Sequence, residues 1–262
     1  MNTSETALIT GASNGIGYEL AKIFARHGYN LVLVARSEHQ LQQLAQEVKK
    51  EYNVEAIIFS VDLSKPETVQ YIYTELEKKN IAIDYLVNNA GFGDFGFFTE
   101  TEWEKEQQMI QLNIIALTHL TKLFVKPMAA RQKGRVLNVA STAAFQPGPL
   151  MAVYYATKAF VLFLSEAIAN ELKGTGVTVT ALCPGPTQSG FQSAAAMEES
   201  KLVKNKKLPT AKQVAEYGYK AMMKGKHVAI HGLINKIMAF SIRLTPRRLT
   251  TSIVRKLSEK NN

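Results

Sequence analysis

Short apolar runs alternate along the chain with longer segments in which apolar residues recur at helical spacing. The runs are rich in Val, Ile and Leu at consecutive positions, which is typical of parallel strands covered by helices on both faces. They predict seven strands, at residues 6–10, 30–35, 54–60, 83–89, 135–141, 177–183 and 227–230. The segments between them predict helices at residues 16–27, 38–51, 66–79, 102–131, 151–173 and 211–224.

This regular alternation of strand and helix, with short connections, implies right-handed crossovers and a single sheet. The expected fold class is therefore α/β: a doubly wound, mainly parallel seven-stranded sheet with helices on both faces. We expect one domain over residues 1–232, with residues 233–262 as a basic amphipathic C-terminal extension of the same domain.

The composition is that of an ordinary globular chain, with 46% apolar and 20% charged residues among 262. The single cysteine, Cys183, has no disulfide partner within the chain, which favours a cytoplasmic location. No uninterrupted apolar run reaches the roughly 18 residues of a membrane helix, and the start MNTSETALIT lacks the layout of a signal peptide. The five histidines are not at metal-ligand spacing, so no metal is expected.

The net charge of +9 is unevenly distributed, which argues against a nucleic-acid-binding domain. Residues 201–262 hold 15 of the 31 Lys and Arg but only two acids, Glu216 and Glu259. Residues 1–200 hold 16 basic against 20 acidic residues. A nucleic-acid binder would need a strongly salt-dependent affinity supplied by the tail alone, so no nucleic-acid partner is expected.

The segment after the first strand suits a dinucleotide. It reads Thr10-Gly11-Ala12-Ser13-Asn14-Gly15-Ile16-Gly17 and leads directly into a helix. Glycines let the backbone approach a pyrophosphate closely, and the helix offers free N–H groups and the positive end of its dipole. The alternative is a glycine-rich turn that only joins strand to helix.

The same segment has the TGxxxGxG pattern of the short-chain dehydrogenase/reductase family, and five later motifs follow in the order of that family. These are Asn88-Asn89-Ala90-Gly91, Asn113, Ser141, Tyr154 with Lys158, and Pro184-Gly185. The chain resembles the family over about residues 5–232. The resemblance implies a Rossmann-like fold and an oxidoreductase that interconverts a small-molecule carbonyl and an alcohol with NAD(P)(H). It also implies a homodimer or homotetramer.

The end of the second strand favours NADP(H) over NAD(H). Arg36 lies there and no acid occupies the strand end; a guanidinium suits the 2′-phosphate of NADP by charge and geometry. The alternative is a solvated arginine neutralised by Glu38. Asp62 matches the family position that contacts adenine, although a lone Asp at a strand end is equally a helix or turn cap.

The resemblance supplies a full set of expected site residues. The cofactor-binding set is Gly11, Ser13, Asn14, Gly15, Ile16, Gly17, Arg36, Asp62, Leu63, Asn89, Ala90, Gly91, Tyr154, Lys158, Pro184, Gly185 and Thr187. The catalytic set is Asn113, Ser141, Tyr154 and Lys158. In the family, Lys158 would hold the nicotinamide ribose and Thr187 would contact the carboxamide. Asn113 would position the helix backbone and a water that relays protons; its alternative is a surface amide.

Tyr154 and Lys158 are four residues apart and therefore lie on the same helix face. A nearby ammonium favours the ionised phenol, so we expect Lys158 to lower the pKa of Tyr154 from its ordinary value of about 10. Tyr154 then acts as the acid–base catalyst, protonating the carbonyl oxygen in reduction. Ser141 ends a strand at the same sheet edge and is expected to bind the substrate oxygen; its alternative is a turn or cap residue.

Three loops are expected to shape the substrate pocket. Two of them supply apolar side chains expected to wall a pocket for a hydrophobic ketone, aldehyde or secondary alcohol. These side chains are Phe92, Phe95, Phe97, Phe98, Phe145, Leu150 and Met151. The alternative is that they cover the core or a subunit contact. The third loop, residues 188–207, is interpreted as a mobile lid.

The tail mixes apolar and basic residues over residues 233–256 and is interrupted by Pro246, which predicts two short amphipathic helices. One interpretation is packing against the parent fold or a second subunit. The other is weak attachment to an anionic membrane surface or to a partner. A rival to the enzyme is a non-catalytic dinucleotide-binding sensor or scaffold that acts through this tail. The pairing of Tyr154 with Lys158 argues against it, because a sensor has no need of a proton-transfer pair.

Overall fold

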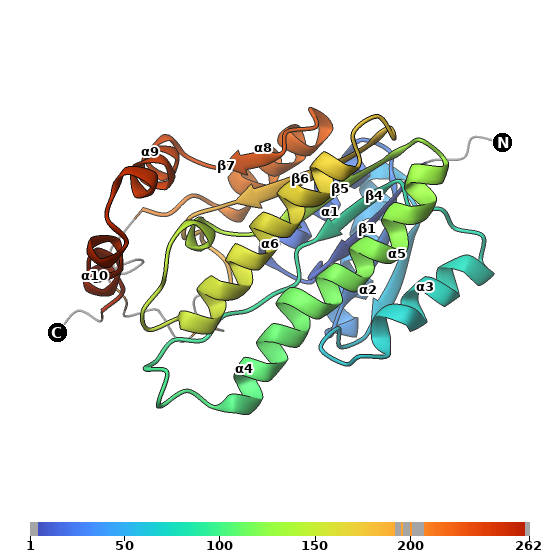
Figure 1. The fold of residues 1–262 in the computed structure, drawn as a ribbon. Coiled ribbons are helices and arrows are strands. Elements are labelled where there is room, and N and C mark those ends of the chain that lie inside the picture. Colours follow the sequence, from blue (N-terminus) through green and yellow to red (C-terminus); the bar gives the residue numbers. More distant parts are fainter. Residues whose placement is uncertain (1–4, 192–194, 196–199, 201–206, 260–262) are drawn as a thin grey trace.

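The computed structural model describes residues 5–191, 195, 200 and 207–259. Its strands are β1 (Thr6–Thr10), β2 (Asn30–Ala35), β3 (Ala56–Ser60), β4 (Tyr85–Asn88), β5 (Gly134–Val139), β6 (Val177–Cys183) and β7 (Val228–Ile230). Across the sheet formed by the described residues they follow the order β3-β2-β1-β4-β5-β6-β7, and every neighbouring pair is parallel (Figure 1). The predicted doubly wound α/β fold is confirmed.

The helices follow the predicted pattern, with ends that differ from it by at most two residues. They are α1 (Gly15–Arg26), α2 (Glu38–Tyr52), α3 (Thr68–Lys78), α4 (Trp103–Ile110), α5 (Leu117–Ala130), α6 (Ala152–Glu171), α8 (Ala211–Met223), α9 (Leu233–Ser241) and α10 (Arg247–Ser258). A π-helical segment, η1 (Gln111–Ala116), joins α4 to α5, and the described residues also form two 3-10 turns, η2 (Thr142–Phe145) and η3 (Ile242–Leu244). The single helix predicted over residues 102–131 is therefore widened in its middle.

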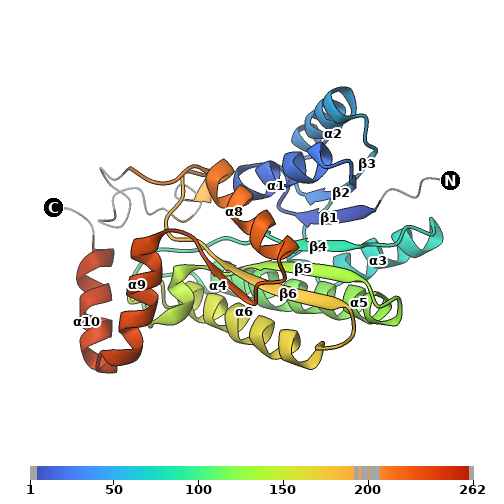
Figure 2. The same ribbon diagram turned by 90° about the horizontal axis from the view of Figure 1, so that it is seen from above.

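Two helical layers bury the sheet, as Figure 2 shows: α1, α2 and α8 lie on one face, and α3, α4, α5 and α6 on the other. Successive side chains of a strand point to opposite faces. Accordingly, the fully buried Leu8 packs in the cluster that contains Phe124 of α5, while its neighbour Ile9 packs in the cluster that contains Phe24 of α1. Apolar residues at consecutive positions are thus explained by a strand covered on both sides.

Among the described residues, only α6 is long and apolar enough to cross a membrane. This is weak evidence, because the core helix of a globular protein has the same length and composition. Val161 and Leu162 of α6 are buried in an apolar cluster with β6 residues, and the N-terminal part of the helix carries Tyr154 and Lys158. We therefore interpret α6 as a core helix.

The two helices predicted in the tail are present as α9 and α10, which lie side by side beyond the carboxyl ends of β6 and β7 (Figures 1 and 2). Val254 of α10 joins the apolar cluster that contains Met151 and Tyr155. The tail therefore packs against the parent fold on one side. Most of the segment interpreted as a lid, residues 188–207, lies outside the described residues.

Candidate active site

A cavity of about 660 Å³ lies at the carboxyl edge of the sheet, where open α/β sheets bind ligands. Its wall includes every predicted cofactor-binding residue except Gly17 and every predicted catalytic residue except Asn113. The structure therefore brings the separate sequence motifs together around one space. The described residues contain no group of three or more His, Cys, Asp or Glu side chains that could hold a metal ion.

The glycine-rich turn after β1 depends on three glycines. Gly11 and Gly15 have φ of +67° and +56°, a region that favours glycine. A Cβ at Gly17 would come within 2.2 Å of the Gly11 carbonyl oxygen, so Gly17 permits close packing rather than lining the cavity. The N-cap of α1, Asn14, makes no side-chain capping bond and the first turn holds no acid. This helix N-terminus is accordingly suited to a phosphate.

Asn89 fixes the glycine-rich turn against β4. Its Nδ2 donates to the carbonyl oxygens of Thr10 at 2.9 Å and Gly11 at 3.2 Å. In return, Thr10 Oγ1 accepts from the backbone N–H groups of Asn89 and Ala90, each at 3.0 Å. The two strands that carry the turn and the Asn-Ala-Gly motif are therefore held in register at the cavity wall.

Arg36 is exposed at the end of β2 and lines the cavity together with Ser13 and Gln40. Among the described residues it forms no ion pair. The Glu38 carboxylate instead accepts a hydrogen bond from Gln42 Nε2 at 2.9 Å. Neutralisation of Arg36 by Glu38, the alternative considered from the sequence, is therefore not found in this structure.

Asp62 combines both roles considered for it, since it caps a turn and also lines the cavity. Its Oδ1 accepts from Ser64 N at 2.9 Å and from Ser64 Oγ at 2.7 Å. Burial disfavours the ionised carboxylate, but the hydrogen bonds from Ser64 and the positive charge of Arg36 outweigh it and lower the pKa of Asp62. This end of the cavity therefore offers an ionised hydrogen-bond acceptor.

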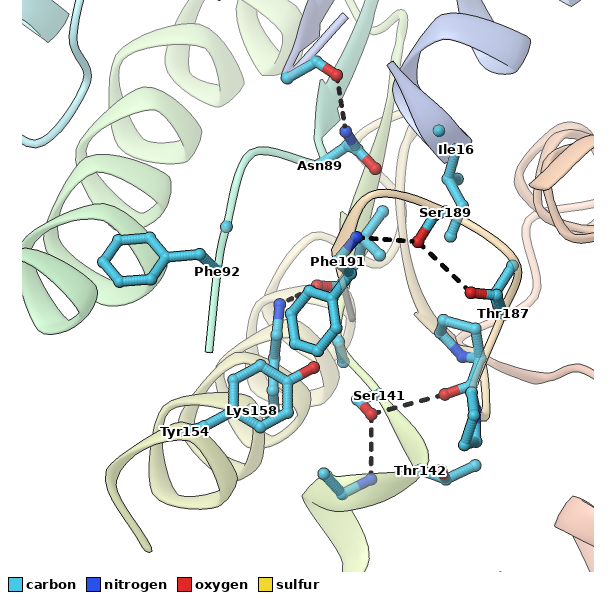
Figure 3. Close-up of a pocket in the computed structure, with 18 of the residues that line it drawn as sticks. Ile16, Asn89, Phe92, Ser141, Thr142, Tyr154, Lys158, Thr187, Ser189 and Phe191 are labelled. Carbon is cyan, nitrogen blue, oxygen red and sulfur yellow. Dashed lines mark hydrogen bonds between the residues drawn. The ribbon is translucent and has the colours of Figure 1, made fainter. Parts of the chain in front are cut away.

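Ser141, Tyr154 and Lys158 lie near one another in the cavity wall (Figure 3). Tyr154 and Lys158 are 8% and 5% exposed, and Lys158 Nζ lies 5.8 Å from the centre of the Tyr154 ring. Lys158 Nζ donates to the Val139 carbonyl oxygen at 2.8 Å. Ser141 Oγ accepts from Ala143 N at 3.1 Å, so this serine caps η2 and also faces the cavity.

Burial decides the protonation of this pair. It raises the pKa of Tyr154, although a hydrogen bond with Ser141 acts in the opposite direction, and it lowers the pKa of Lys158 to about 8. The expectation that Lys158 lowers the pKa of Tyr154 is therefore wrong for this structure, because burial raises the pKa of Tyr154 and Lys158 is not among the groups that shift it. The phenol stays protonated at neutral pH and is ready to donate a proton.

Asn113 is buried in η1 and acts on the backbone rather than on the cavity. Its Nδ2 donates to the Phe92 carbonyl oxygen at 3.0 Å and to Thr157 Oγ1 at 3.1 Å, and its Oδ1 accepts from Phe92 N at 3.3 Å. A Cβ at Gly91 would lie 2.8 Å from Asn113 Oδ1. Asn113 therefore joins the loop after β4 to α6, and its placement in a π-helical turn is a frequent feature of functional sites. The alternative of a surface amide is wrong.

Sequence reasoning missed a buried polar chain beneath the site. Asn88 Nδ2 donates to Thr121 Oγ1 and to Asn138 Oδ1, both at 2.9 Å. Asn138 Nδ2 donates in turn to Ser165 Oγ at 2.9 Å. These bonds connect β4 and β5 to α5 and α6. A polar residue inside an apolar strand, as Asn138 is in RVLNV, is the signal that was available in the sequence.

Phe191 is a second residue that sequence reasoning missed. Its ring lies against the ring of Tyr154, with centroids 5.2 Å apart (Figure 3). Phe191 Cζ would be 2.9 Å from a Cβ at Gly93, so a larger residue at position 93 would displace it. Phe191 therefore narrows the space beside the phenol.

The apolar wall of the cavity differs from the expected one. Of the seven side chains proposed from the loops, only Phe92 and Met151 line it, and Phe97 and Phe98 are 47% and 69% exposed. The tail takes their place, with lining residues Asn235, Met238, Ala239, Ser241, Ile242, Thr245, Thr250, Ile253, Val254 and Leu257. The Arg255 guanidinium lies 4.7 Å from the centre of the Phe97 ring, and this contact ties α10 to the loop after β4.

Comparison with known proteins gives a consistent result. A family model described as short chain dehydrogenase matches residues 5–200. The mouse 17-beta-hydroxysteroid dehydrogenase type 3 is 32% identical over 246 residues, which cover 93% of this chain and 77% of that protein. The human very-long-chain 3-oxoacyl-CoA reductase is 34% identical over 184 residues, or 69% of this chain, but the match spans only 58% of the human protein. A short-chain dehydrogenase from Sphingobium yanoikuyae, solved in complex with NADPH, has a TM-score of 0.81 at 31% identity and covers 92% of this chain and 94% of that one.

Proposed function

Because the chain belongs to the short-chain dehydrogenase family and is an oxidoreductase acting on CH–OH and C=O groups, we propose that it reduces bulky apolar ketones with NADPH. The reverse reaction oxidises the corresponding secondary alcohols. One observation carries this proposal: the phosphate-binding turn, the Ser141, Tyr154 and Lys158 triad and the apolar tail residues share a single cavity.

The cavity wall fits the pyrophosphate and the 2′-phosphate of NADPH. The N-terminus of α1 and the glycine turn offer N–H groups to the pyrophosphate. Arg36 and Ser13 suit the 2′-phosphate, and no carboxylate of the described residues pairs with Arg36. The resemblance to a protein crystallised with NADPH supports the same choice. Bound NADPH supplies the hydride that reduces the carbonyl carbon.

The residues of the chain supply the proton. Tyr154, whose pKa burial raises, donates the proton of its hydroxyl to the carbonyl oxygen as the oxygen gains negative charge. Ser141 Oγ, which lines the same cavity, holds that oxygen in position. Lys158 stabilises the phenolate that remains, and it does so in a buried site where the attraction between opposite charges is strong.

Two features favour a bulky apolar substrate. The tail contributes Met238, Ile242, Ile253, Val254 and Leu257 to the wall, and ligand sites of several hundred Å³ with such walls bury large apolar molecules. The names of the similar mouse and human proteins, a hydroxysteroid dehydrogenase and a very-long-chain acyl-CoA reductase, also refer to large apolar substrates.

A two-stage assay tests this function. The fluorescence of NADPH and of NADH is titrated with protein, and a ketone series of increasing apolar bulk is then added while oxidation of the cofactor is followed. We expect tighter binding of NADPH than of NADH, and kcat/KM that rises with apolar bulk. Preference for short polar ketones would contradict the substrate class. Binding with no turnover of any ketone would favour the non-catalytic sensor instead.

Two expectations from the sequence stay predictions. We propose a cytoplasmic location, supported by the solitary Cys183, and a homo-oligomer, supported by exposed Phe160 and Phe163 on α6. Cell fractionation and analytical ultracentrifugation test them.

A further inference from the structure

The outer side of the tail is unusually apolar. Among the described residues, nine of the sixteen large apolar side chains that are exposed belong to α9, η3 and α10. We refer to them as the tail face: Leu233, Ile234, Ile237, Met238, Phe240, Leu244, Leu249, Ile253 and Leu257. Single exposed apolar residues are ordinary, but a cluster of this size marks an interaction site.

The spacing shows that α9 exposes one continuous stripe. Leu233, Ile237 and Phe240 follow one another at intervals of four and three residues and therefore share one face of α9, and Leu244 follows four residues later in η3. They are 72%, 59%, 63% and 77% exposed. The opposite side of α9 is the one that packs, since Ala239 is its buried residue. The helix thus has an inner side for the protein and an outer side without a partner among the described residues.

Positive charge accompanies this stripe. Residues 233–257 contain Lys236, Arg243, Arg247, Arg248, Arg255 and Lys256 and no acid. Arg255 pairs with Glu259 at 3.3 Å, whereas Arg243, Arg247, Arg248 and Lys256 form no ion pair within the part of the chain that the structure describes. Four cations thus remain available to an anionic partner.

This charge argues against a second copy of the chain as the occupant. A two-fold interface brings the same patch of both subunits together, and here it would oppose cations to cations. An anionic lipid surface meets both properties at once, because it accepts apolar side chains below its headgroups and attracts Lys and Arg at their level.

The tail face is also continuous with the cavity. Met238, Ile253 and Leu257 line the cavity and are nevertheless 46%, 46% and 44% exposed. They therefore form its rim, between α9 and α10. An apolar molecule that leaves a bilayer at this point meets apolar side chains from the surface to the interior.

We propose that the tail face docks the protein on the surface of an anionic bilayer and turns the mouth of the cavity toward the lipid. In this arrangement α9 and α10 lie in the plane of the membrane interface and do not cross the bilayer. Docking rests on the surface alone and does not require the proposed reaction.

Co-sedimentation with vesicles tests the proposal with the full-length protein. We expect binding to vesicles of phosphatidylcholine mixed with phosphatidylglycerol, weak binding to pure phosphatidylcholine, and release by salt. The triple variant Arg243→Gln/Arg247→Gln/Arg248→Gln should lower the partition coefficient about a hundredfold, at about fivefold per charge. A matched control, Lys79→Gln/Lys122→Gln/Lys173→Gln, removes three exposed cations elsewhere and should bind as the wild type does.

A second pair of variants tests the apolar contribution. Phe240→Ser removes a ring that is 63% exposed, and Trp103→Ser on α4 removes one that is 61% exposed. Only Phe240→Ser should weaken vesicle binding, by about tenfold. Equal losses for both variants, or no binding of the wild type to anionic vesicles, would overturn the proposal. A third result would also overturn it: a wild-type protein that does not bind vesicles and that forms a dimer in ultracentrifugation, with Phe240→Ser dissociating that dimer. NADPH titration of the same variants, which leave the cavity wall intact, reports separately on the proposed function.

Discussion

The ring of Phe191 lies on the ring of Tyr154, at an interplanar angle of 47° and a centroid distance of 5.2 Å. The proton donor of the site is therefore covered on one side by a side chain that forms no part of the proton transfer. Since Phe191 also borders Gly93, it limits the space beside the phenol in which a substituent of a carbonyl substrate would lie.

Replacing Phe191 should change the preference for substrate size. We expect Phe191→Ala to raise the ratio of kcat/KM for a bulky ketone over a small one by about tenfold, which is the usual effect of pocket volume on discrimination. Steady-state kinetics with two ketones of one series measure it. Phe98→Ala is the control, because Phe98 is 69% exposed and does not line the cavity. An unchanged ratio for Phe191→Ala would show that this ring does not limit access.

Removing one hydroxyl should stop turnover. Tyr154→Phe keeps the shape of the site but removes the proton donor, so kcat should fall by about a thousandfold or more while NADPH affinity stays within about twofold. The neighbouring Tyr155, which is also buried and lines the cavity, provides a matched control: Tyr155→Phe should lower kcat less than about tenfold. Comparable losses in the two variants would remove Tyr154 from its role as the acid.

The buried Lys158 should lower the free energy of unfolding at neutral pH. Burial lowers its pKa to about 8 from 10.5, so the folded protein bears the full cost of the buried ammonium below pH 8. That cost declines as pH rises from 8 to 10.5. Lys158→Met removes this cost, worth about 3 kcal/mol, and loses the hydrogen bond to Val139, worth about 1 to 2 kcal/mol.

The net expectation is that Lys158→Met is inactive and more stable than the wild type by about 1 to 2 kcal/mol at pH 7. The advantage should shrink toward pH 10, where the wild-type lysine sheds its proton in the folded state. Urea unfolding at both pH values measures it. A gain of the same size at pH 7 and pH 10 would mean that the buried charge is not its source.

Arg36 should select between the two cofactors. A charge-assisted contact contributes about 1.5 to 3 kcal/mol, so Arg36→Ala should raise the Kd for NADPH by about tenfold to a hundredfold and leave the Kd for NADH nearly unchanged. Arg26→Ala removes another exposed arginine, which does not line the cavity, and should affect neither value. If Arg36→Ala weakened the binding of NADPH and of NADH equally, the 2′-phosphate would have to bind elsewhere.

Gly17 should tolerate no side chain. A Cβ there would lie 2.2 Å from the Gly11 carbonyl oxygen and 2.4 Å from Asn89 Nδ2, so Gly17→Ala should destabilise the protein by about 3 kcal/mol and weaken binding of the dinucleotide. Gly28 has φ of +81° with nothing within 4 Å of an added Cβ, and Gly28→Ala should cost about 1 kcal/mol. Thermal unfolding of both variants separates close packing from backbone strain.

The elements and the cavity were predictable because each leaves a local mark in the sequence. The fully buried Leu8 and Ile9 are both apolar because helices cover both faces of β1. Tyr154 and Lys158 lie on one face because four residues are about one helical turn. Motifs that follow parallel strands meet because the carboxyl ends of those strands share one edge.

Properties that depend on distant packing were not predictable. Phe92, Phe97 and Phe98 are phenylalanines of the same loop, and the sequence does not distinguish them. Only Phe92 lines the cavity, because Phe97 contacts Arg255 of α10 instead. The pKa of Tyr154 depends on how completely the surrounding elements exclude water, and spacing along one helix carries no information about that. The placement of the tail on the cavity likewise required the three-dimensional structure.

The cavity wall is built from two separate stretches of the sequence. Every cofactor-binding and proton-transfer residue assigned above lies between Gly11 and Thr187, whereas the tail's share of the wall begins at Asn235, after β7 closes the sheet. A single genetic crossover just downstream of β7 would therefore exchange the tail's share of the cavity wall and leave the residues assigned to cofactor binding and proton transfer intact. In lineages that share this arrangement, new substrate ranges are expected to arise by recombination downstream of β7, as well as by point mutation around Tyr154.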